Sequence, residues 1–151
     1  MDKDAFVREI DRCGGMLFRM AWSLLQNRED CRDAMQETAL RAWEKRHTLR
    51  NEAWFSTWVA RILINVCHDI QRRRRRMVPL EETAEPFAEP EDPALSLALQ
   101  RLPEKLRLPL MMQCAEGMSY AEIARALRTT EAAVRGRIYR AREQLRKELE
   151  A

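Results

Sequence analysis

Residues 78–93 constrain the fold of this chain most, because they combine four prolines with six acidic side chains and carry no basic one. Proline has no backbone N–H and breaks regular elements, and dense like charge opposes compaction. We therefore expect a flexible acidic linker here rather than a helix or strand. It would join one domain at residues 1–77 to a second at residues 94–151.

The two flanking segments are both basic and both carry helical patterns of apolar residues. Residues 1–77 hold 16 basic and 11 acidic side chains, and residues 94–151 hold 11 basic and seven acidic ones. The chain has only four glycines and no alternation of β-branched residues, so strands are not expected. The fold class is predicted to be all-α, with two small helical domains joined by the linker.

Composition also argues against several classes of protein. No apolar run reaches the roughly 18 residues that a membrane-spanning helix needs, and no signal peptide is visible. We therefore expect a cytoplasmic protein with no membrane insertion. None of the cysteines forms a C-x-x-C pair, and all four are expected to be buried free thiols: Cys13, Cys31, Cys67 and Cys114.

Apolar residues at i, i+3 and i+4 spacing predict four helices before the linker. They are expected at residues 4–13, 16–27, 30–45 and 53–76. Gly14-Gly15 is expected to break or bend the chain between the first two. The last ends in five consecutive arginines, Arg72–Arg76. Phe55 and Trp58 lie on its apolar face and are expected in the core, while Trp54 is left open as a possible stacking platform.

Proline and glycine mark the first helices after the linker. A short helix is predicted at residues 94–102, and a second at residues 104–116, entered through Pro103 at its first position. Pro109 lies inside this second helix, so a kink or a restart is expected there. Gly117 is suited to end it.

Residues 119–142 show the pattern of a helix-turn-helix, the motif that places a basic helix in the DNA major groove. Ser119 with Glu122 forms a capping box at the first helix, and a three-residue break follows Leu127. Four arginines of the second helix lie off its apolar stripe and can face outward: Arg135, Arg137, Arg140 and Arg142. A solvated charged helix surface is the alternative interpretation.

Three segments, in this order, resemble those of the extracytoplasmic-function (ECF) sigma factors of bacterial RNA polymerase. Residues 27–43, with the spacing D-x-x-D-x-x-Q-E, are similar to the polymerase-binding helix. Residues 55–76 look like the helix that reads the minus-ten promoter element, and residues 102–142 like the domain that reads the minus-thirty-five element. The resemblance implies sigma region 2 at residues 1–77 and sigma region 4 at residues 94–151.

The resemblance also implies roles for particular residues. Polymerase binding would fall on one helical face, formed by Asp30, Asp33, Gln36 and Glu37. Minus-ten recognition would use the loop at residues 47–54 and a base contact from Asn65. Phosphate contacts would come from Arg61, Arg72, Arg73 and Arg74. Minus-thirty-five recognition would use Arg135, Gly136, Arg137 and Arg140. On pattern alone, the acids and the arginine run would equally suit solvated helix surfaces.

Two positions depart from the family pattern. Gly136 stands where relatives commonly have serine, and a glycine inside a helix costs about 1 kcal/mol relative to alanine. Close approach of the helix to DNA would explain it, and so would tight packing on another helix. Arg128 stands where the turn commonly has glycine, which implies a different turn or an arginine in an unusual backbone conformation.

The function implied is that of an ECF-type sigma factor, which binds core RNA polymerase and directs promoter-specific transcription initiation. Its partners would be core RNA polymerase, promoter DNA and an anti-sigma factor. No metal site, cofactor site or catalytic constellation is visible, so no enzymatic activity is expected. Two other functions stay open: a stand-alone helix-turn-helix regulator that binds operators as a dimer, and a helical adaptor that binds an acidic protein.

Overall fold

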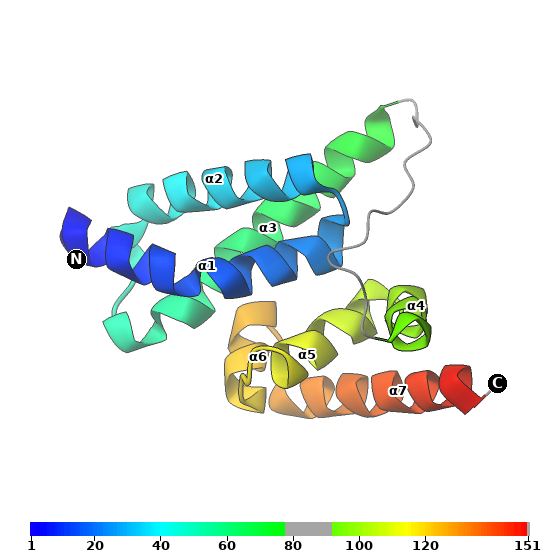
Figure 1. Cartoon of the computed structure of the whole chain (residues 1–151). Helices are drawn as coiled ribbons and strands as arrows, with labels where there is room; N and C mark the ends of the chain where they lie inside the picture. The colour runs from blue at the N-terminus through cyan, green and yellow to red at the C-terminus, as the bar shows by residue number, and fades with distance from the viewer. Residues whose placement is uncertain (78–91, 151) are drawn as a thin grey trace. The chain divides into compact units, whose positions relative to one another are not determined.

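The computed structural model describes residues 1–77 and 92–150, which form seven α-helices and two short 3₁₀ helices, with no strand among them (Figure 1). This confirms the all-α class. The chain divides into two compact units, Met1–Glu85 and Pro86–Ala151. Of the acidic linker predicted at residues 78–93, residues 78–91 lie outside the described residues.

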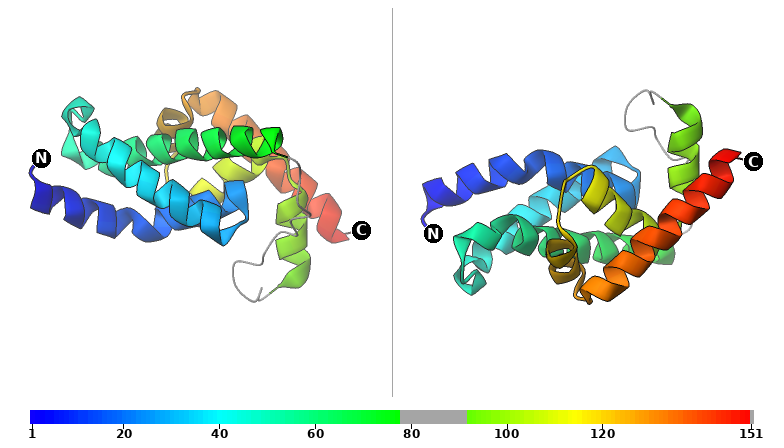
Figure 2. Two further views of the ribbon diagram at one scale, coloured as in Figure 1. Left: turned by 90° about the horizontal axis from the view of Figure 1, so that it is seen from above. Right: turned by 90° about the horizontal axis from the view of Figure 1, so that it is seen from below.

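The N-terminal unit contains three long helices that all pack against one another, α1 (Lys3–Leu25), α2 (Arg28–Glu44) and α3 (Phe55–Arg76) (Figure 2). Two 3₁₀ turns, Arg46–Thr48 and Glu52–Trp54, connect α2 to α3. The side chains that α2 buries are all small, which lets its backbone approach both neighbours: Cys31, Ala34, Thr38 and Ala42.

The break predicted at Gly14-Gly15 is wrong, because α1 is one continuous helix through both glycines. A glycine pair weakens an isolated helix by about 2 kcal/mol relative to alanine. The apolar stripe that runs across the pair outweighs this, since Cys13, Leu17 and Met20 are all buried against the other helices. The sequence predicts four helices before the linker, whereas the structure has three α-helices there.

An aromatic cluster closes one end of the N-terminal unit. The ring of Phe6 lies edge-on to Trp43 and Phe55, with centroids 5.2 and 5.9 Å apart. Phe55 is fully buried, as predicted, while Trp58 is half-buried and donates a hydrogen bond from Nε1 to Thr48 Oγ1 at 3.3 Å. Trp54, left open by the sequence, is 49% exposed.

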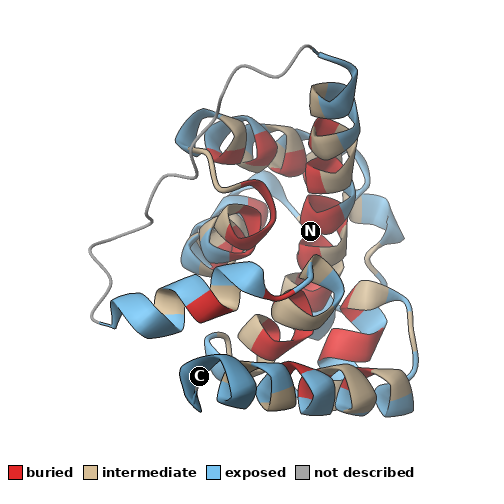
Figure 3. Ribbon diagram, turned by 90° about the vertical axis from the view of Figure 1, so that its right-hand side faces the viewer, coloured by how far each residue is buried: buried red, intermediate tan, exposed pale blue. Residues whose placement is uncertain are grey.

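The C-terminal unit consists of four helices, α4 (Pro93–Arg101), α5 (Glu104–Cys114), α6 (Tyr120–Leu127) and α7 (Glu131–Glu150). The long helix α7 contacts each of the other three. Figure 3 shows the buried residues of each unit gathered where its helices meet. Helix α4 begins one residue earlier than predicted, at Pro93, and Asp92 caps it.

Helix α5 also differs from its prediction at both prolines. Pro103 is the N-cap residue of α5 rather than its first helical residue. Pro109 causes no restart, because the helix continues through it and the ring is fully buried among core side chains. Burial of the ring offsets the hydrogen bond that a proline removes from a helix.

Local signals set the ends of the helices around the turn. Ser119 Oγ accepts from the N–H of Glu122 and Glu122 Oε1 accepts from the N–H of Ser119, both at 3.1 Å, which confirms the capping box. Gly117 has φ +65° and follows α5, as predicted for a helix stop. Arg128 is left-handed, with φ 54° and ψ 50°, so of the two alternatives for this position the unusual backbone conformation is confirmed.

Burial of the cysteines was predicted correctly for three of the four. Cys13, Cys31 and Cys67 are buried free thiols, and burial raises the pKa of Cys31 to about 11. Cys114 is exposed, at the last residue of α5, so its predicted burial is wrong.

Candidate functional site

The acidic face predicted for polymerase binding lies on α2. Asn27 caps this helix, its side chain accepting a hydrogen bond from the N–H of Asp30 at 3.0 Å. Asp33 and Gln36 are exposed, whereas Asp30 and Glu37 are partly buried. The structure therefore brings the four predicted residues onto one helical face, but only two of them are fully open.

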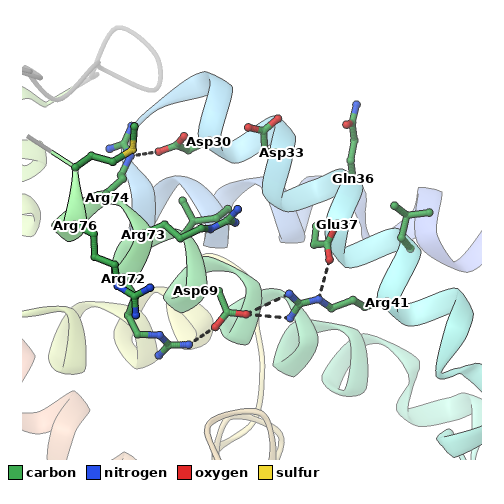
Figure 4. A pocket seen from close by; sticks show the side chains of 13 residues that line it. Asp30, Asp33, Gln36, Glu37, Arg41, Asp69, Arg72, Arg73, Arg74 and Arg76 are labelled. Carbon is green, nitrogen blue, oxygen red and sulfur yellow. Dashed lines mark hydrogen bonds and ion pairs between the residues drawn. The ribbon is translucent and has the colours of Figure 1, made fainter.

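A hollow of about 780 Å³ lies beside this face, between α2 and the C-terminal half of α3 (Figure 4). All four residues of the acidic face line it, and so do the arginines at positions 72–74. The sequence assigned these two sets to different partners. In the folded chain they share the walls of one hollow.

Ion pairs connect the two walls of the hollow. Asp30 on α2 pairs with Arg74 on α3. Arg41 donates from Nε to Glu37 Oε1 at 3.0 Å and from both Nη atoms to Asp69 Oδ2 at 3.2 Å. Asp69 also pairs with Arg72 through its other oxygen. Four alternating charges thus form a chain across the hollow: Glu37, Arg41, Asp69 and Arg72 (Figure 4).

This chain shifts the titration of its central groups. Burial alone would raise the pKa of Asp69, but hydrogen bonds from Arg41 and Arg72 hold it below its ordinary value. Burial opposes the charge of Arg41 as well, yet its bonds to Glu37 and Asp69 raise its pKa. Both groups are therefore charged at neutral pH.

The minus-ten residues predicted on α3 do not all face the same way. Arg61, Asn65 and Arg72 follow one another at i, i+4 and i+11, which places them on one stripe of the helix. Asn65 and Arg72 are exposed and Arg61 is half-buried. Arg74 is nine residues past Asn65, on the opposite side of the helix, where it meets Asp30. Arg73 is exposed at the edge of the hollow.

The minus-thirty-five residues predicted on α7 lie on its outer side or its flanks. Arg135 and Arg140 are exposed, and Gly136 and Arg137 are half-buried. The helix is fixed from the other side by Val134, Ile138 and Ala141, which are buried. Thr130 Oγ1 accepts from the N–H of Ala133 at 3.1 Å and so caps the first turn of α7.

Tight packing on another helix does not account for Gly136. A Cβ added there would meet Arg140 Nη1 at 3.3 Å, and its three nearest heavy atoms all belong to the Arg140 guanidinium. Of the two explanations for this glycine, the observed surroundings favour close approach of an external surface.

Arg142 is exposed, as the sequence allowed, and it also binds α5. Its Nη2 donates to Gln113 Oε1 at 2.8 Å and lies 3.9 Å from Cys114 Sγ. Farther along, Arg101 of α4 pairs with Glu148 at 3.0 Å. These contacts hold α7 against the rest of its unit, so they orient the exposed arginines nearer its start.

Sequence reasoning missed exposed apolar and aromatic residues on both candidate surfaces. Leu40 is 60% exposed and lines the hollow next to the acidic face. Tyr139 is 67% exposed on α7, beside Arg140. The Arg135 guanidinium lies over the ring of Tyr120 on α6. Leu40 and Tyr139 could have been found from the sequence, because each is a large apolar or aromatic residue that lies off the buried stripe of its helix.

Comparisons with known proteins agree with this architecture. The sequence model of the family described as Sigma-70 region 2 matches residues 10–77, and that of Sigma-70, region 4 matches residues 93–145. The ECF RNA polymerase sigma-E factor of Haemophilus influenzae is 29% identical, over 99% of this chain and 89% of that protein. The ECF RNA polymerase sigma factor SigM of Mycobacterium tuberculosis is 34% identical, over 95% and 76%.

Solved structures show the same fold. The sigma factor RpoE from Bartonella quintana, crystallised with the anti-sigma factor NepR, has a TM-score of 0.80 and 23% identity over 99% of both chains. CnrH, solved with the cytosolic domain of CnrY, has a TM-score of 0.74 and 27% identity over 99% of this chain and 90% of that one.

The chain therefore belongs to the extracytoplasmic-function RNA polymerase sigma factors. Members of this class are transcription initiation factors that bind core RNA polymerase and promoter DNA. The family inferred from three sequence segments is confirmed. Among the described residues, no helix is long and apolar enough to cross a membrane.

Proposed function

We propose a division of labour within the chain. Helix α2 binds core RNA polymerase, the exposed stripe of α3 contacts the minus-ten element, and α7 reads the minus-thirty-five element. The observation that carries this proposal is the segregation of exposed charge. The face of α2 formed by Asp30, Asp33, Gln36 and Glu37 carries only acidic charge, while Arg28 and Arg32 are exposed elsewhere on that helix. The charged residues of the α3 stripe and of residues 135–142 of α7 are all arginines.

On α2, Asp33 and Gln36 supply the accessible contacts to polymerase, and Glu37 supports them with a side chain that is 45% exposed. Asp30 contributes from a more enclosed position, because its side chain is 18% exposed and paired with Arg74. An exposed leucine, Leu40, extends the face with an apolar contact. The matching surface on polymerase would be basic, with an apolar spot.

On α3, Asn65 is suited to hydrogen-bond a base edge, because its amide offers both a donor and an acceptor. Arg61, Arg72 and Arg73 supply phosphate contacts, which raise affinity without reading sequence. Opening the promoter unstacks bases at a cost of a few kcal/mol each, and such contacts offset it. Arg74, which is turned toward α2, contributes least to DNA in this arrangement.

On α7, Arg135 and Arg140 are the candidates for guanine contacts in the major groove, with Arg137 on the flank of the same helix. Gly136 lets the helix backbone come close to DNA, since the three heavy atoms nearest to a Cβ added there all belong to the flexible Arg140 side chain. Neither unit needs to bind DNA tightly alone, because attachment to polymerase raises the effective concentration of both.

Three further properties follow from this function. The chain would act in the cytoplasm, where transcription takes place, and would carry no enzymatic activity of its own. Its activity would be restrained by an anti-sigma partner that covers the binding surfaces. The structure of CnrH with the cytosolic domain of CnrY supports the idea of a protein partner.

Promoter-specific run-off transcription with core RNA polymerase tests the proposal. The chain should start transcription at a defined site only when core polymerase is present. A stand-alone regulator would instead bind an operator tightly without polymerase, and an adaptor would show no dependence on DNA. Either of those results would contradict the proposed function.

A further inference from the structure

Asp69 lies on α3, yet arginines from two helices hold it. Its Oδ2 accepts hydrogen bonds from Nη1 and Nη2 of Arg41 on α2, both at 3.2 Å. Its Oδ1 accepts from Arg72, three residues along α3. Both oxygens of the carboxylate are therefore occupied, one by each helix (Figure 4).

Arg41 connects Asp69 to the acidic face of α2, because it also binds Glu37. It lies one helical turn after Glu37, and its Nε donates to Glu37 Oε1 at 3.0 Å. A guanidinium is a planar, rigid fork, so fixing both Nη atoms on Asp69 also fixes the direction of the Nε–H. The Glu37 carboxylate is thereby held at the edge of the hollow.

We propose that Asp69 is a positioning residue for polymerase binding: it holds Arg41, and Arg41 holds the Glu37 carboxylate in the orientation that polymerase meets. This inference rests on the proposed function and adds to it a residue from outside α2. The gain is preorganisation, since a carboxylate ordered before docking loses less side-chain freedom on binding.

The chemistry of the site explains why an aspartate is required at this position. Asparagine would keep one carbonyl oxygen but would turn an amide N–H₂ toward the donors of the second arginine. Glutamate would keep both oxygens and the charge while moving them by one methylene. Asp69→Asn should therefore break the arrangement and Asp69→Glu should partly preserve it.

Asp69 could instead be only a structural tie between α2 and α3. Such a tie also runs through Arg41, but it would weaken polymerase binding by loosening α2, so its effect would remain when Glu37 is replaced. Comparing Asp69→Asn in the wild-type and Glu37→Gln backgrounds separates these two roles. Glu44, an exposed acid at the end of α2, offers a matched control because Glu44→Gln removes the same charge from the unit.

The test measures the Kd of the full-length chain for core RNA polymerase by fluorescence competition, with thermal unfolding as the check of folding. We expect Asp69→Asn and Arg41→Gln each to weaken binding about threefold to tenfold. The double variant Glu37→Gln with Asp69→Asn should bind polymerase no more weakly than Glu37→Gln alone. Glu44→Gln should stay within about twofold of wild type, and Asp69→Glu should recover part of the loss.

Wild-type affinity of a folded Asp69→Asn chain would overturn the inference, and so would a full additive loss in the double variant. If Asp69→Asn does not fold, Arg41→Lys decides: a lysine ammonium lacks the rigid fork, so wild-type affinity of that variant would also overturn it. Asp33→Arg reports on the proposed function separately. If it too binds polymerase normally, the α2 face itself is misassigned.

Discussion

The guanidinium of Arg135 on α7 lies over the ring of Tyr120 on α6, its central carbon 5.2 Å from the ring centroid. Tyr120 is the first residue of α6, directly after the Ser119 cap. The contact therefore joins the start of one helix of the helix-turn-helix to the arginine proposed to read DNA from the other. Stacking of this kind limits the positions that a long arginine side chain can adopt.

Tyr120→Ala should weaken binding of the polymerase-bound chain to minus-thirty-five DNA about twofold to fivefold, because the ring no longer orders Arg135. Tyr120→Phe keeps the ring and should stay near wild type. Fluorescence anisotropy with a labelled promoter fragment measures both variants. Equal losses would assign the effect to the hydroxyl group instead.

Gly136→Ala should have opposite effects on stability and on DNA binding. Alanine favours a helix interior over glycine by about 1 kcal/mol, and the new Cβ meets only the mobile end of Arg140, at 3.3 Å. The thermal midpoint should therefore rise, while affinity for minus-thirty-five DNA should fall because the helix can no longer approach as closely. Unchanged DNA affinity would remove close approach as the reason for this glycine.

Arg73 and Arg74 provide a matched pair of adjacent arginines on α3. Arg73 is exposed, whereas Arg74 is paired with Asp30 across the hollow. Arg73→Ala should reduce the salt dependence of DNA binding by about one phosphate contact and leave stability nearly unchanged. Arg74→Ala should lower the thermal midpoint and leave the salt dependence close to that of wild type. If Arg74→Ala instead reduced the salt dependence and left the thermal midpoint unchanged, Arg74 would be a DNA contact after all.

The stability contributed by Asp69 should depend on pH. Burial would raise the pKa of Asp69, but its hydrogen bonds from Arg41 and Arg72 lower it below the ordinary value. The unfolded chain then takes up the proton more readily, so the stabilisation is full above the ordinary aspartate pKa of about 3.9 and is lost as the pH falls through the lowered value.

The urea midpoints of wild type and Asp69→Asn check this expectation. Their difference should be constant from about pH 5 to 7 and should shrink as the pH falls below about 3.9. A difference that persists undiminished in strong acid would show that the ion pairs are not its source.

The features that the sequence predicted well are those controlled by short-range chemistry. The Ser119–Glu122 capping box, the stop at Gly117 and the left-handed Arg128 each depend on a few neighbouring backbone groups. The buried stripe of α7 follows in the same way from helical spacing. The helix-turn-helix is therefore predictable from its own residues alone.

The features that it missed depend on contacts between helices. Nothing local to Gly14-Gly15 shows that α2 and α3 bury the stripe running through it, so the local pattern predicts two helices where the structure has one. The pairing of Asp30 with Arg74 joins residues that the sequence pattern assigned to different partners. Asp69 was overlooked because its importance comes from Arg41, on another helix.

One comparison tests the division of labour most directly: core polymerase affinity and promoter-specific run-off transcription, measured side by side for Arg140→Ala and for Asp33→Arg combined with Glu37→Arg. We expect Arg140→Ala to bind polymerase as wild type does but to lose transcription from promoters that depend on the minus-thirty-five element. The double variant should lose polymerase binding, and transcription with it. Equal loss of polymerase affinity in both variants would contradict the proposed separation of the two surfaces.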